Sequence, residues 1–372
     1  MASDGMAGAR SIRAAVLRAH GEPLAVETLR LRAPGPGELR VTLAACAVCH
    51  SDLSAADGIW NGAVPVVLGH EAAGTVEAVG AGVTRVAPGD RVVVTLVRSC
   101  QSCKPCGEGD EVLCAHVPAP GSPLSDGTGA SVGQGMDTGA FAEAVTVHES
   151  QVAPIPDALS FELASLLGCG VLTGFGAVAN VARLEAGSSA VVVGCGGVGL
   201  NAVQGARAAG AGTIVAVDPA ADRRDQALAL GATHAVDPGE ADAVEAVRGV
   251  AGGRGADAVF VAAGRAALMT GAVAMLAPGG QLVVLGMPPS GATASYEPVS
   301  LAFYGQRIVG SRMGGAVVAR DVPMLAAMHL RGELELASLI GGRWPLERVN
   351  EAFAAARAGE GARQVIVFGG DA

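Results

Sequence analysis

Short apolar runs, broken by glycine and proline, dominate the first part of the chain. From Ile12 to about Val147 they include LRVTLAACAVC, AAGTVEAVG and DRVVVTLV, with turn residues between them. Runs of this length that are rich in β-branched residues and end at turn signals are typical of strands. The pattern predicts an irregular, mostly β domain over residues 1–170.

From about Val171 the pattern changes to apolar strands that alternate with alanine-rich helical stretches. SAVVVGCGGVG, TIVAVD, ADAVFVAAG and GGQLVVLG have the pattern of strands, and NAVQGARAAGA and RRDQALALGA that of helices. Such alternation is typical of βαβ units on a parallel sheet. We predict an α/β fold in which a doubly wound parallel sheet, residues 171–312, is inserted in the β domain. Residues 313–372 then return to that domain through two amphipathic helices and the strand QVIVFG.

Length and charge agree with this division. A chain of 372 residues, half of them apolar, exceeds what one core usually serves. No apolar run reaches the roughly 18 uncharged residues of a membrane span, and Met1–Arg13 has no apolar stretch of the signal-peptide type. The net charge is −10 and the basic residues are dispersed, which argues against nucleic acid as a partner. We therefore predict a soluble, cytoplasmic protein whose partner is a small molecule, not nucleic acid or a membrane.

Four of the eight cysteines are close in the sequence, separated by two, two and seven residues: Cys100, Cys103, Cys106 and Cys114. Four thiolates at such spacing can enclose one Zn²⁺ and leave no position for water. The alternative, four thiols on a loop without a metal, would be open to oxidation. We predict a structural zinc lobe over about residues 98–116.

Three further ligand types are far apart in the sequence: Cys49 in CHSDL, His70 in LGHEAAG and Cys169 in LLGCGVLTG. Two thiolates and an imidazole would leave one zinc position open for water or an alcohol, whose pKa the metal lowers. Taken alone, a histidine such as His70 is more often a hydrogen-bonded core residue than a metal ligand. The zinc-lobe cysteines and a dinucleotide motif in the same chain favour a second, catalytic zinc.

That dinucleotide motif follows the strand Ala190–Val193 and opens a helix: Gly194, Gly196, Gly197, Val198 and Gly199 form its turn. Gly194 permits the tight turn, Gly196 the approach of a pyrophosphate and Gly199 close helix packing. The next strand ends at Asp218, where a carboxylate can accept hydrogen bonds from both ribose hydroxyls and repel a 2′-phosphate. We predict NAD(H), with Arg223 also near the cofactor; Arg223 and Arg224 could instead accommodate a phosphate. The alternative is a ligand-free turn with Asp218 as a helix cap.

As a set these motifs resemble the zinc-dependent medium-chain alcohol dehydrogenases, in which a GroES-like catalytic domain is joined to a Rossmann domain. The resemblance runs from about residue 12 to 369 and rests on CHSDL, LGHEAAGTVEAVG, PGDRVVV, the four-cysteine lobe, LLGCGVLTGFGA and GCGGVGLNAVQGA. The intact lobe resembles one branch of the family. LNAVQGAR and VHESQVAPIPD are similar to bacterial members that keep their nicotinamide cofactor tightly bound and are assayed with a nitroso-dye acceptor.

The resemblance implies roles around the catalytic zinc. Cys49, His70 and Cys169 would be its ligands, Glu71 would lie behind the metal and Asp52 would fix the His70 tautomer. Ser51 would hydrogen-bond the bound alcohol and pass its proton on. Asp52 could instead be only a helix cap, and Ser51 only a turn-forming hydroxyl.

Roles at the cofactor and the substrate follow from the same resemblance. His50 and Arg363 would contact the cofactor pyrophosphate, and Thr173 would hold the nicotinamide. Ser54, Trp60 and Leu96 fall in the substrate pocket, where a tryptophan favours an aromatic or cyclic substrate. The alternatives are a surface charge for Arg363, a turn hydroxyl for Thr173 and packing at the domain edge for Trp60.

The resemblance implies that zinc polarises a substrate oxygen while hydride passes between an alcohol/aldehyde or ketone pair and NAD(H). Many relatives carry a histidine, the outer base of a proton relay, where this chain has Ser54. A serine cannot act as a base near pH 7.

Three alternatives stay open: a thiol-adduct dehydrogenase of the formaldehyde type, a biosynthetic enzyme that uses tightly bound NAD(H) for an unusual or redox-neutral reaction, and a non-catalytic zinc and nucleotide-binding protein. The family's relatives pair through an edge strand, near QLVVLG and RIVGS here, which implies a homodimer, with a tetramer as the alternative.

Overall fold

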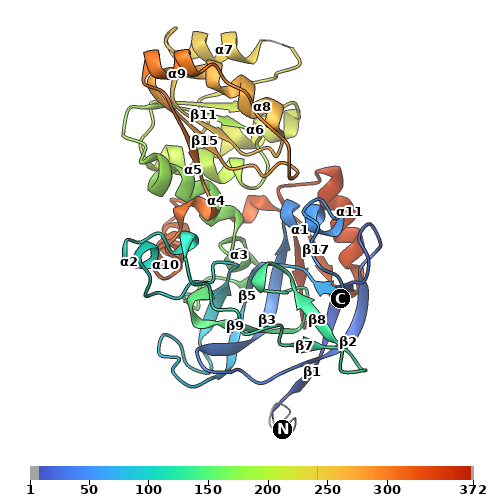
Figure 1. The fold of residues 1–372 in the computed structure, drawn as a ribbon. Helices are drawn as coiled ribbons and strands as arrows, with labels where there is room; N and C mark the ends of the chain where they lie inside the picture. The colour runs from blue at the N-terminus through green and yellow to red at the C-terminus, as the bar shows by residue number, and fades with distance from the viewer. Residues whose placement is uncertain (1–7, 241, 370–372) are drawn as a thin grey trace. The chain divides into compact units, whose positions relative to one another are not determined.

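The computed structural model describes residues 8–240 and 242–369. Much of Met1–Arg13, for which we predict no signal peptide, lies outside the described residues. The chain divides into two compact units (Figure 1): unit 1 comprises the residues up to Cys169 and those from Val317 on, and unit 2 comprises Gly170–Ala316. The return at Val317 comes after the predicted position 313. The reason is that the turn Met313–Gly315 packs on helix α4 (Gly170–Gly176), where a Cβ added to Gly314 would lie 2.3 Å from the Leu172 carbonyl oxygen.

Unit 1 is built mainly from strands, in a closed barrel and an adjoining sheet (Figure 1). The barrel, in the order β1-β2-β7-β8-β4, contains β1 (Arg10–Leu17), β2 (Ala25–Leu31), β4 (Val66–Val67), β7 (Leu124–Ser125) and β8 (Ser131–Gln134). The sheet runs β10-β6-β5-β3-β18-β17, with β9 also paired to β3. Its strands are β3 (Glu38–Val48), β5 (Glu71–Val79), β6 (Arg91–Val94), β9 (Ala144–His148), β10 (Val152–Pro154), β17 (Ile340–Pro345) and β18 (Arg363–Val367).

The late strand β18 shows why the two halves of unit 1 form one domain. It pairs antiparallel with β3, with Gln364 opposite Val48 and Ile366 opposite Cys46. The C-terminal segment is therefore hydrogen-bonded into the sheet that the first part of the chain begins. The helices of unit 1 are α1 (His50–Ala56), α2 (Lys104–Gly107), α3 (Phe161–Leu166), α10 (Val318–Leu330) and α11 (Val349–Ala358).

Unit 2 contains a six-stranded sheet, parallel throughout, in the order β13-β12-β11-β14-β15-β16. Its strands are β11 (Ser189–Val193), β12 (Thr213–Val217), β13 (His234–Val236), β14 (Ala256–Val261), β15 (Leu276–Val284) and β16 (Arg307–Gly310). Its helices after α4 are α5 (Gly199–Ala208), α6 (Ala221–Ala229), α7 (Ala243–Val250), α8 (Ala266–Ala272) and α9 (Pro298–Tyr304).

Helices cover both faces of this sheet. Val191 and Val193 of β11 belong to the core that includes Val247 of α7 and Met269 of α8. Val192, on the other face, lies 3.2 Å from a Cβ placed on Gly199 of α5. Burial on both faces explains the near-continuous valine of these strands. The predicted doubly wound sheet inserted in a mostly β domain is confirmed.

Among the described residues we find no helix that combines the length and the apolar character needed to cross a membrane.

Candidate functional site

Four buried side chains converge in unit 1. One ligand atom from each of Cys49, His70, Glu71 and Cys169 lies within 4.8 Å of the others. Cys49 is the N-cap residue of α1, and Cys169 follows α3. His70 directly precedes β5, and Glu71 is the first residue of that strand. Folding thus brings together the three ligands that the sequence separates, and it adds Glu71 as a fourth donor.

The cluster fits a metal ion by its chemistry. Nε2 of His70 is buried without a hydrogen-bond partner, and so is Oε1 of Glu71. An unsatisfied buried nitrogen and carboxylate oxygen beside two thiols are unfavourable unless a further group binds them. Two sulfurs and an imidazole nitrogen are the donors that Zn²⁺ favours in catalytic sites.

The Asp52 carboxylate organises this cluster. Its Oδ1 accepts a hydrogen bond from the Gly69 amide at 2.9 Å and lies 3.1 Å from Nδ1 of His70. Its Oδ2 accepts from the Cys49 amide at 3.0 Å, at the start of α1. Asp52 therefore caps the helix and also orients the imidazole so that Nε2 is left for a metal.

Arg363 lies beside the cluster of Cys49, His70, Glu71 and Cys169. Its Nε donates to Oε2 of Glu71 at 3.2 Å, and both side chains are buried. The resemblance assigns Arg363 to the cofactor pyrophosphate. In the structure its guanidinium is paired with the Glu71 carboxylate of β5. It is not a surface charge.

Charges inside the cluster shift the pKa of its members. A hydrogen bond from Cys169 and the nearby Arg363 lower the pKa of Cys49 well below its usual value, against the effect of burial. Burial raises the pKa of Glu71 to about 8, although Arg363 opposes that shift. Burial disfavours protonated His70, yet Asp52 and Cys49 raise its pKa well above the usual value. The lowered pKa of Cys49 favours the thiolate, which is the form of cysteine that binds a metal cation.

The candidate proton and substrate residues lie along α1 and after β6. Ser51 follows Cys49 by two residues and is half-buried, whereas Ser54, one turn later, is buried. His50 is exposed at the first position of α1, and Trp60 and Leu96 are half-buried. The pairing of β5 with β6 ends at Ala72 and Val94, so Leu96 continues beyond it on the side of Glu71 and His70.

The second cysteine set also converges, in the lobe around α2. The four sulfurs of Cys100, Cys103, Cys106 and Cys114 lie within 4.8 Å of one another, and all four residues are half-buried. The Sγ atoms of Cys103 and Cys106 are 3.4 Å apart, and the Cys100 amide donates to Sγ of Cys114 at 3.2 Å. Hydrogen bonds from Ser102 lower the pKa of Cys100 to about 5. These four sulfurs could enclose one zinc ion and leave no open position.

In unit 2 the glycine turn has the shape that a pyrophosphate needs. Gly194 has φ 92°, and a Cβ on Gly199 would lie 1.8 Å from the Gly194 carbonyl oxygen, so neither position tolerates a side chain. A Cβ on Gly196 would meet no atom within 4 Å, which leaves open space beside the backbone. Gly197 and Val198 complete the turn, and Val198 is the N-cap residue of α5.

Asp218 directly follows β12 and lies beside this turn. The carboxylate is buried, and it accepts hydrogen bonds from the amides of Cys195 at 2.8 Å and Ala220 at 2.9 Å. It is therefore fixed against the glycine turn, where a ribose would bind. Arg224 forms an ion pair with Asp237 at 2.7 Å, and Arg223 is half-buried on α6.

Thr173, the candidate nicotinamide residue, is buried in α4, and its Oγ1 lies 3.6 Å from Sδ of Met313. Gly174 beside it is a residue that the sequence reasoning missed. A Cβ there would lie 2.1 Å from the Val198 carbonyl oxygen, so α4 packs directly on the dinucleotide turn. The repeated glycines of LLGCGVLTGFG were the available signal.

Comparison with known proteins agrees with this geometry. Residues 35–157 match the alcohol dehydrogenase GroES-like domain family, and residues 197–328 match the zinc-binding dehydrogenase family. The chain is 36% identical over 371 residues to the NDMA-dependent alcohol dehydrogenase of Amycolatopsis methanolica, covering 96% of this chain and 99% of that protein.

Two solved structures have the same fold. Benzyl alcohol dehydrogenase from Acinetobacter calcoaceticus superposes with a TM-score of 0.91 at 29% identity, covering 97% of this chain and all of that one. A provisionally named zinc-binding dehydrogenase from Sinorhizobium meliloti, bound to NADP, gives a TM-score of 0.82 at 29% identity, covering 96% and 99%.

The fold and the two sets of site residues define a zinc-type dehydrogenase with a GroES-like and a Rossmann domain. The chain belongs to the zinc-dependent medium-chain alcohol dehydrogenase family, and it is an oxidoreductase of the alcohol dehydrogenase type.

Proposed function

We propose that the chain transfers hydride between NAD(H) and an alcohol/aldehyde or ketone pair, with a zinc ion at the buried cluster of unit 1. The observation that carries the proposal is the convergence of Cys49, His70 and Cys169 with an unpartnered Nε2 on His70. When bound, zinc would supply a Lewis acid for the substrate oxygen, and NAD⁺ would supply the hydride acceptor.

The chain's own residues would prepare this reaction. Asp52 holds His70 in one orientation, and Arg363 holds one oxygen of Glu71. Ser51, two residues after Cys49 on α1, would hydrogen-bond the substrate hydroxyl and accept its proton as the alcohol is oxidised. Ser54 is buried on the same helix and cannot act as the next base, so the proton would leave through water.

NAD(H) is the proposed cofactor, and Asp218 supports it. A fixed, buried carboxylate beside the glycine turn would accept from ribose hydroxyls and repel a 2′-phosphate. Arg224 donates to the Asp218 carbonyl at 2.8 Å and is paired with Asp237, which leaves Arg223 as the other cation of α6 that a phosphate could meet. The NADP-bound relative makes this choice worth testing directly.

For the substrate we propose an aromatic or cyclic primary alcohol. Trp60 is half-buried shortly after α1, close in sequence to the metal ligand Cys49. The similar structure named benzyl alcohol dehydrogenase supports the same class. Benzyl alcohol is therefore the first probe.

The resemblance to an NDMA-dependent relative favours a second candidate, in which NAD(H) stays bound and is reoxidised in place. Purified protein that carries NAD(H) and reduces the nitroso dye without added cofactor would establish it. Release of free NADH at each turnover would exclude it.

The central test combines metal analysis with an NADH-formation assay. Wild-type protein should contain two zinc ions and oxidise benzyl alcohol, and Cys49→Ser should keep one zinc ion and lose activity. Cys46→Ser is the matched control, because Cys46 is equally buried, three residues away, and outside the cluster. Activity in the one-zinc Cys49→Ser protein would refute the proposal.

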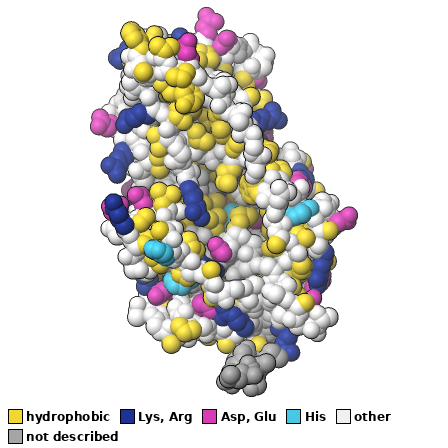
Figure 2. Space-filling view, viewed as in Figure 1, with side chains coloured by type: hydrophobic (Ala, Val, Ile, Leu, Met, Phe, Trp, Pro, Cys, Tyr) yellow, Lys and Arg dark blue, Asp and Glu magenta, His cyan; other side chains and the backbone are white. Residues whose placement is uncertain are grey.

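We also propose a homodimer formed through unit 2. Strand β16 is an exposed edge of the parallel sheet, and α9 before it exposes Val299 at 67% and Phe303 at 81%. Figure 2 shows hydrophobic side chains gathered in the upper part of the view, over the region in which Figure 1 places α9. An exposed edge strand beside an apolar patch favours a second copy as its partner.

Light scattering tests the dimer. Ile308→Lys, on the exposed edge, should give a monomer, whereas Leu228→Lys, an equally exposed residue of α6, should not. A wild-type monomer would refute the dimer. A cytoplasmic location, in keeping with cysteines that serve as ligands, belongs to the same proposal.

A further inference from the structure

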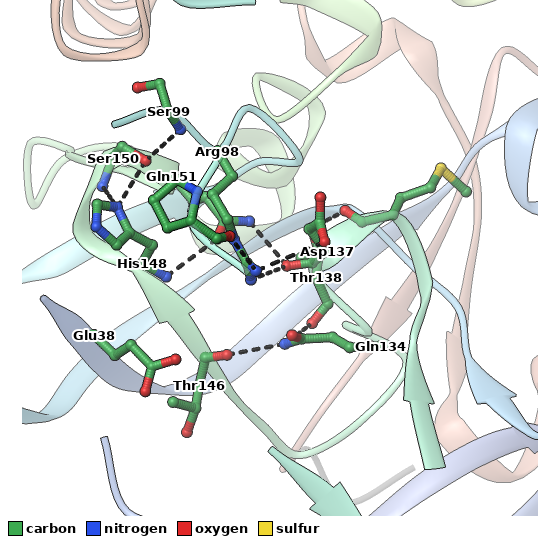
Figure 3. Close-up of polar contacts among 12 residues, drawn as sticks. Glu38, Arg98, Ser99, Gln134, Asp137, Thr138, Thr146, His148, Ser150 and Gln151 are labelled. Atoms are coloured by element: carbon green, nitrogen blue, oxygen red, sulfur yellow. Dashed lines mark hydrogen bonds and ion pairs between the residues drawn. The ribbon is translucent and has the colours of Figure 1, made fainter. Parts of the chain in front are cut away.

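A network of buried polar side chains lies in unit 1 between the end of β6, the turn after β8 and the entry to the four-cysteine lobe (Figure 3). Gln151 lies at its centre and is fully buried. Its Nε2 donates to the carbonyl oxygens of Thr95 and Asp137, each at 3.0 Å. Its Oε1 accepts from Nε of Arg98 at 2.8 Å and from the His148 amide at 3.1 Å. The amide uses its full hydrogen-bonding capacity.

Arg98 brings a positive charge into this interior. Nη2 donates to the Asp137 carbonyl at 3.0 Å, Nη1 donates to the Pro118 carbonyl at 3.3 Å, and Nη1 lies 3.6 Å from the Asp137 carboxylate. A buried guanidinium is tolerated only with partners in fixed positions. Arg98 lies two residues before Cys100, the first cysteine of the lobe. Its hydrogen bond to Asp137 therefore ties the start of the lobe to the turn after β8.

The turn that these groups hold is strained. Met136 and Asp137 have φ 49° and 56°, a left-handed conformation that side chains disfavour. Thr138 Oγ1 donates to the Met136 carbonyl at 2.9 Å. The Asp137 carbonyl accepts hydrogen bonds from both Gln151 and Arg98, and these bonds hold the turn in its left-handed conformation.

The other segment that Gln151 holds adjoins the metal cluster. Thr95 and Leu96 follow Val94, which pairs with Ala72, the residue after Glu71. A Cβ placed on Gly168 would lie 2.9 Å from both the Glu71 Cα and the Val94 carbonyl oxygen. The chain that Gln151 fixes at Thr95 therefore begins in backbone contact with the cluster.

We propose that Gln151 and Arg98 are positioning residues for the substrate site: they lock Thr95–Leu96 and the left-handed Met136–Asp137 turn together as one wall of it. This inference rests on the proposed function. Neither side chain touches the reacting atoms. Arg98 lies two residues before Cys100, so the four-cysteine lobe continues directly from the same wall.

Steady-state kinetics with benzyl alcohol and hydrogen–deuterium exchange test this role. Gln151→Met keeps the side-chain volume and removes all four hydrogen bonds. Arg98→Lys keeps the positive charge but removes the planar guanidinium that donates several hydrogen bonds in fixed directions. Each should raise KM about tenfold, with kcat, zinc content and NADH affinity close to wild type. Amides of residues 95–97 and 136–138 should exchange faster.

Thr146→Val is the matched control. Thr146 is buried near this network, and its hydroxyl donates to the Arg32 carbonyl at 3.3 Å. Its side chain has no hydrogen bond to Thr95 or Asp137. Its KM should not change. The proposal would be overturned if KM and amide exchange were unchanged in both test variants. It would also be overturned if KM rose equally in Thr146→Val, or if the test variants lost the catalytic zinc. A wild type that oxidises no alcohol would refute the proposed function, and the exchange data alone would then decide the positioning role.

Discussion

Asp52 and His70 are joined in unit 1 by a contact of 3.1 Å between Oδ1 and Nδ1, and the same carboxylate accepts the Cys49 amide that opens α1. A single side chain thus sets the start of a helix, the position of one proposed metal ligand and the orientation of another. The sequence left two interpretations of Asp52 open, a helix cap or a partner of the histidine. The structure shows both.

Asp52→Asn should weaken the catalytic zinc about 10–100-fold, because a neutral amide holds the imidazole less firmly and turns a donor toward the Cys49 or Gly69 amide. Chelator competition measures the affinity, and the four-cysteine zinc should be unaffected. Asp157→Asn, whose side chain is almost fully exposed, is the control. Equal zinc affinity in Asp52→Asn and wild type would contradict the orienting role.

From the serine at position 54 we predict an unusual pH dependence of kcat. Without a histidine at this position, kcat for alcohol oxidation should rise steeply with pH, and Ser54→His should flatten the rise by supplying a base. Since Ser54 is only 7% exposed, Ser54→Gln controls for the bulk of the new side chain. A profile that stays the same in Ser54→His, in a protein that still folds, would rule out a missing relay.

His148 should make stability depend on pH. Burial lowers its pKa, although Glu149 opposes the shift, and its Nδ1 accepts from the Ser150 amide at 3.2 Å, which a protonated ring cannot do. Below about pH 6.5 the unfolded chain gains a proton that the folded chain resists, so stability falls until the lowered folded pKa is reached.

His148→Asn keeps an acceptor but does not titrate, so its thermal midpoint should fall less than that of wild type between about pH 7 and pH 5. The surface residue His20 supplies the control variant His20→Asn, which should follow wild type. Parallel curves for wild type and His148→Asn would show that another group is responsible.

Asp218→Asn should shift cofactor preference toward NADP(H) by about tenfold, because it removes the charge that repels a 2′-phosphate while keeping one acceptor for the Cys195 amide. Fluorescence titration with NADH and NADPH gives the ratio of Kd values. Asp222→Asn, exposed on the following helix, should leave that ratio as it is. If Asp218→Asn also leaves it unchanged, the carboxylate does not face the ribose.

The sequence could predict those features whose residues lie close together along the chain, but not the contacts between residues that only folding brings together. The four cysteines of the predicted zinc lobe and the glycines around Gly196 each lie within one turn or loop, so their spacing in the sequence was enough to predict that they come together. The fourth donor Glu71 was visible as the neighbour of His70, but its contact with Arg363 depends on β18 lying beside β3. The Gln151–Arg98 pair joins the segments around residues 95–98, 137 and 151, which are far apart in the sequence. No short-range sequence pattern predicts such a contact.

The pairing of β18 with β3 also sets an order of assembly during synthesis. The four cysteines of the lobe span only residues 100–114, so they can capture zinc while most of the chain is still unmade. Cys49, His70 and Cys169 are translated in the first half, yet Arg363, the guanidinium that balances Glu71, emerges from the ribosome near the end. A nascent chain could therefore bring the four cysteines of the lobe together early, whereas Glu71 would gain its ion-pair partner Arg363 only as translation finishes.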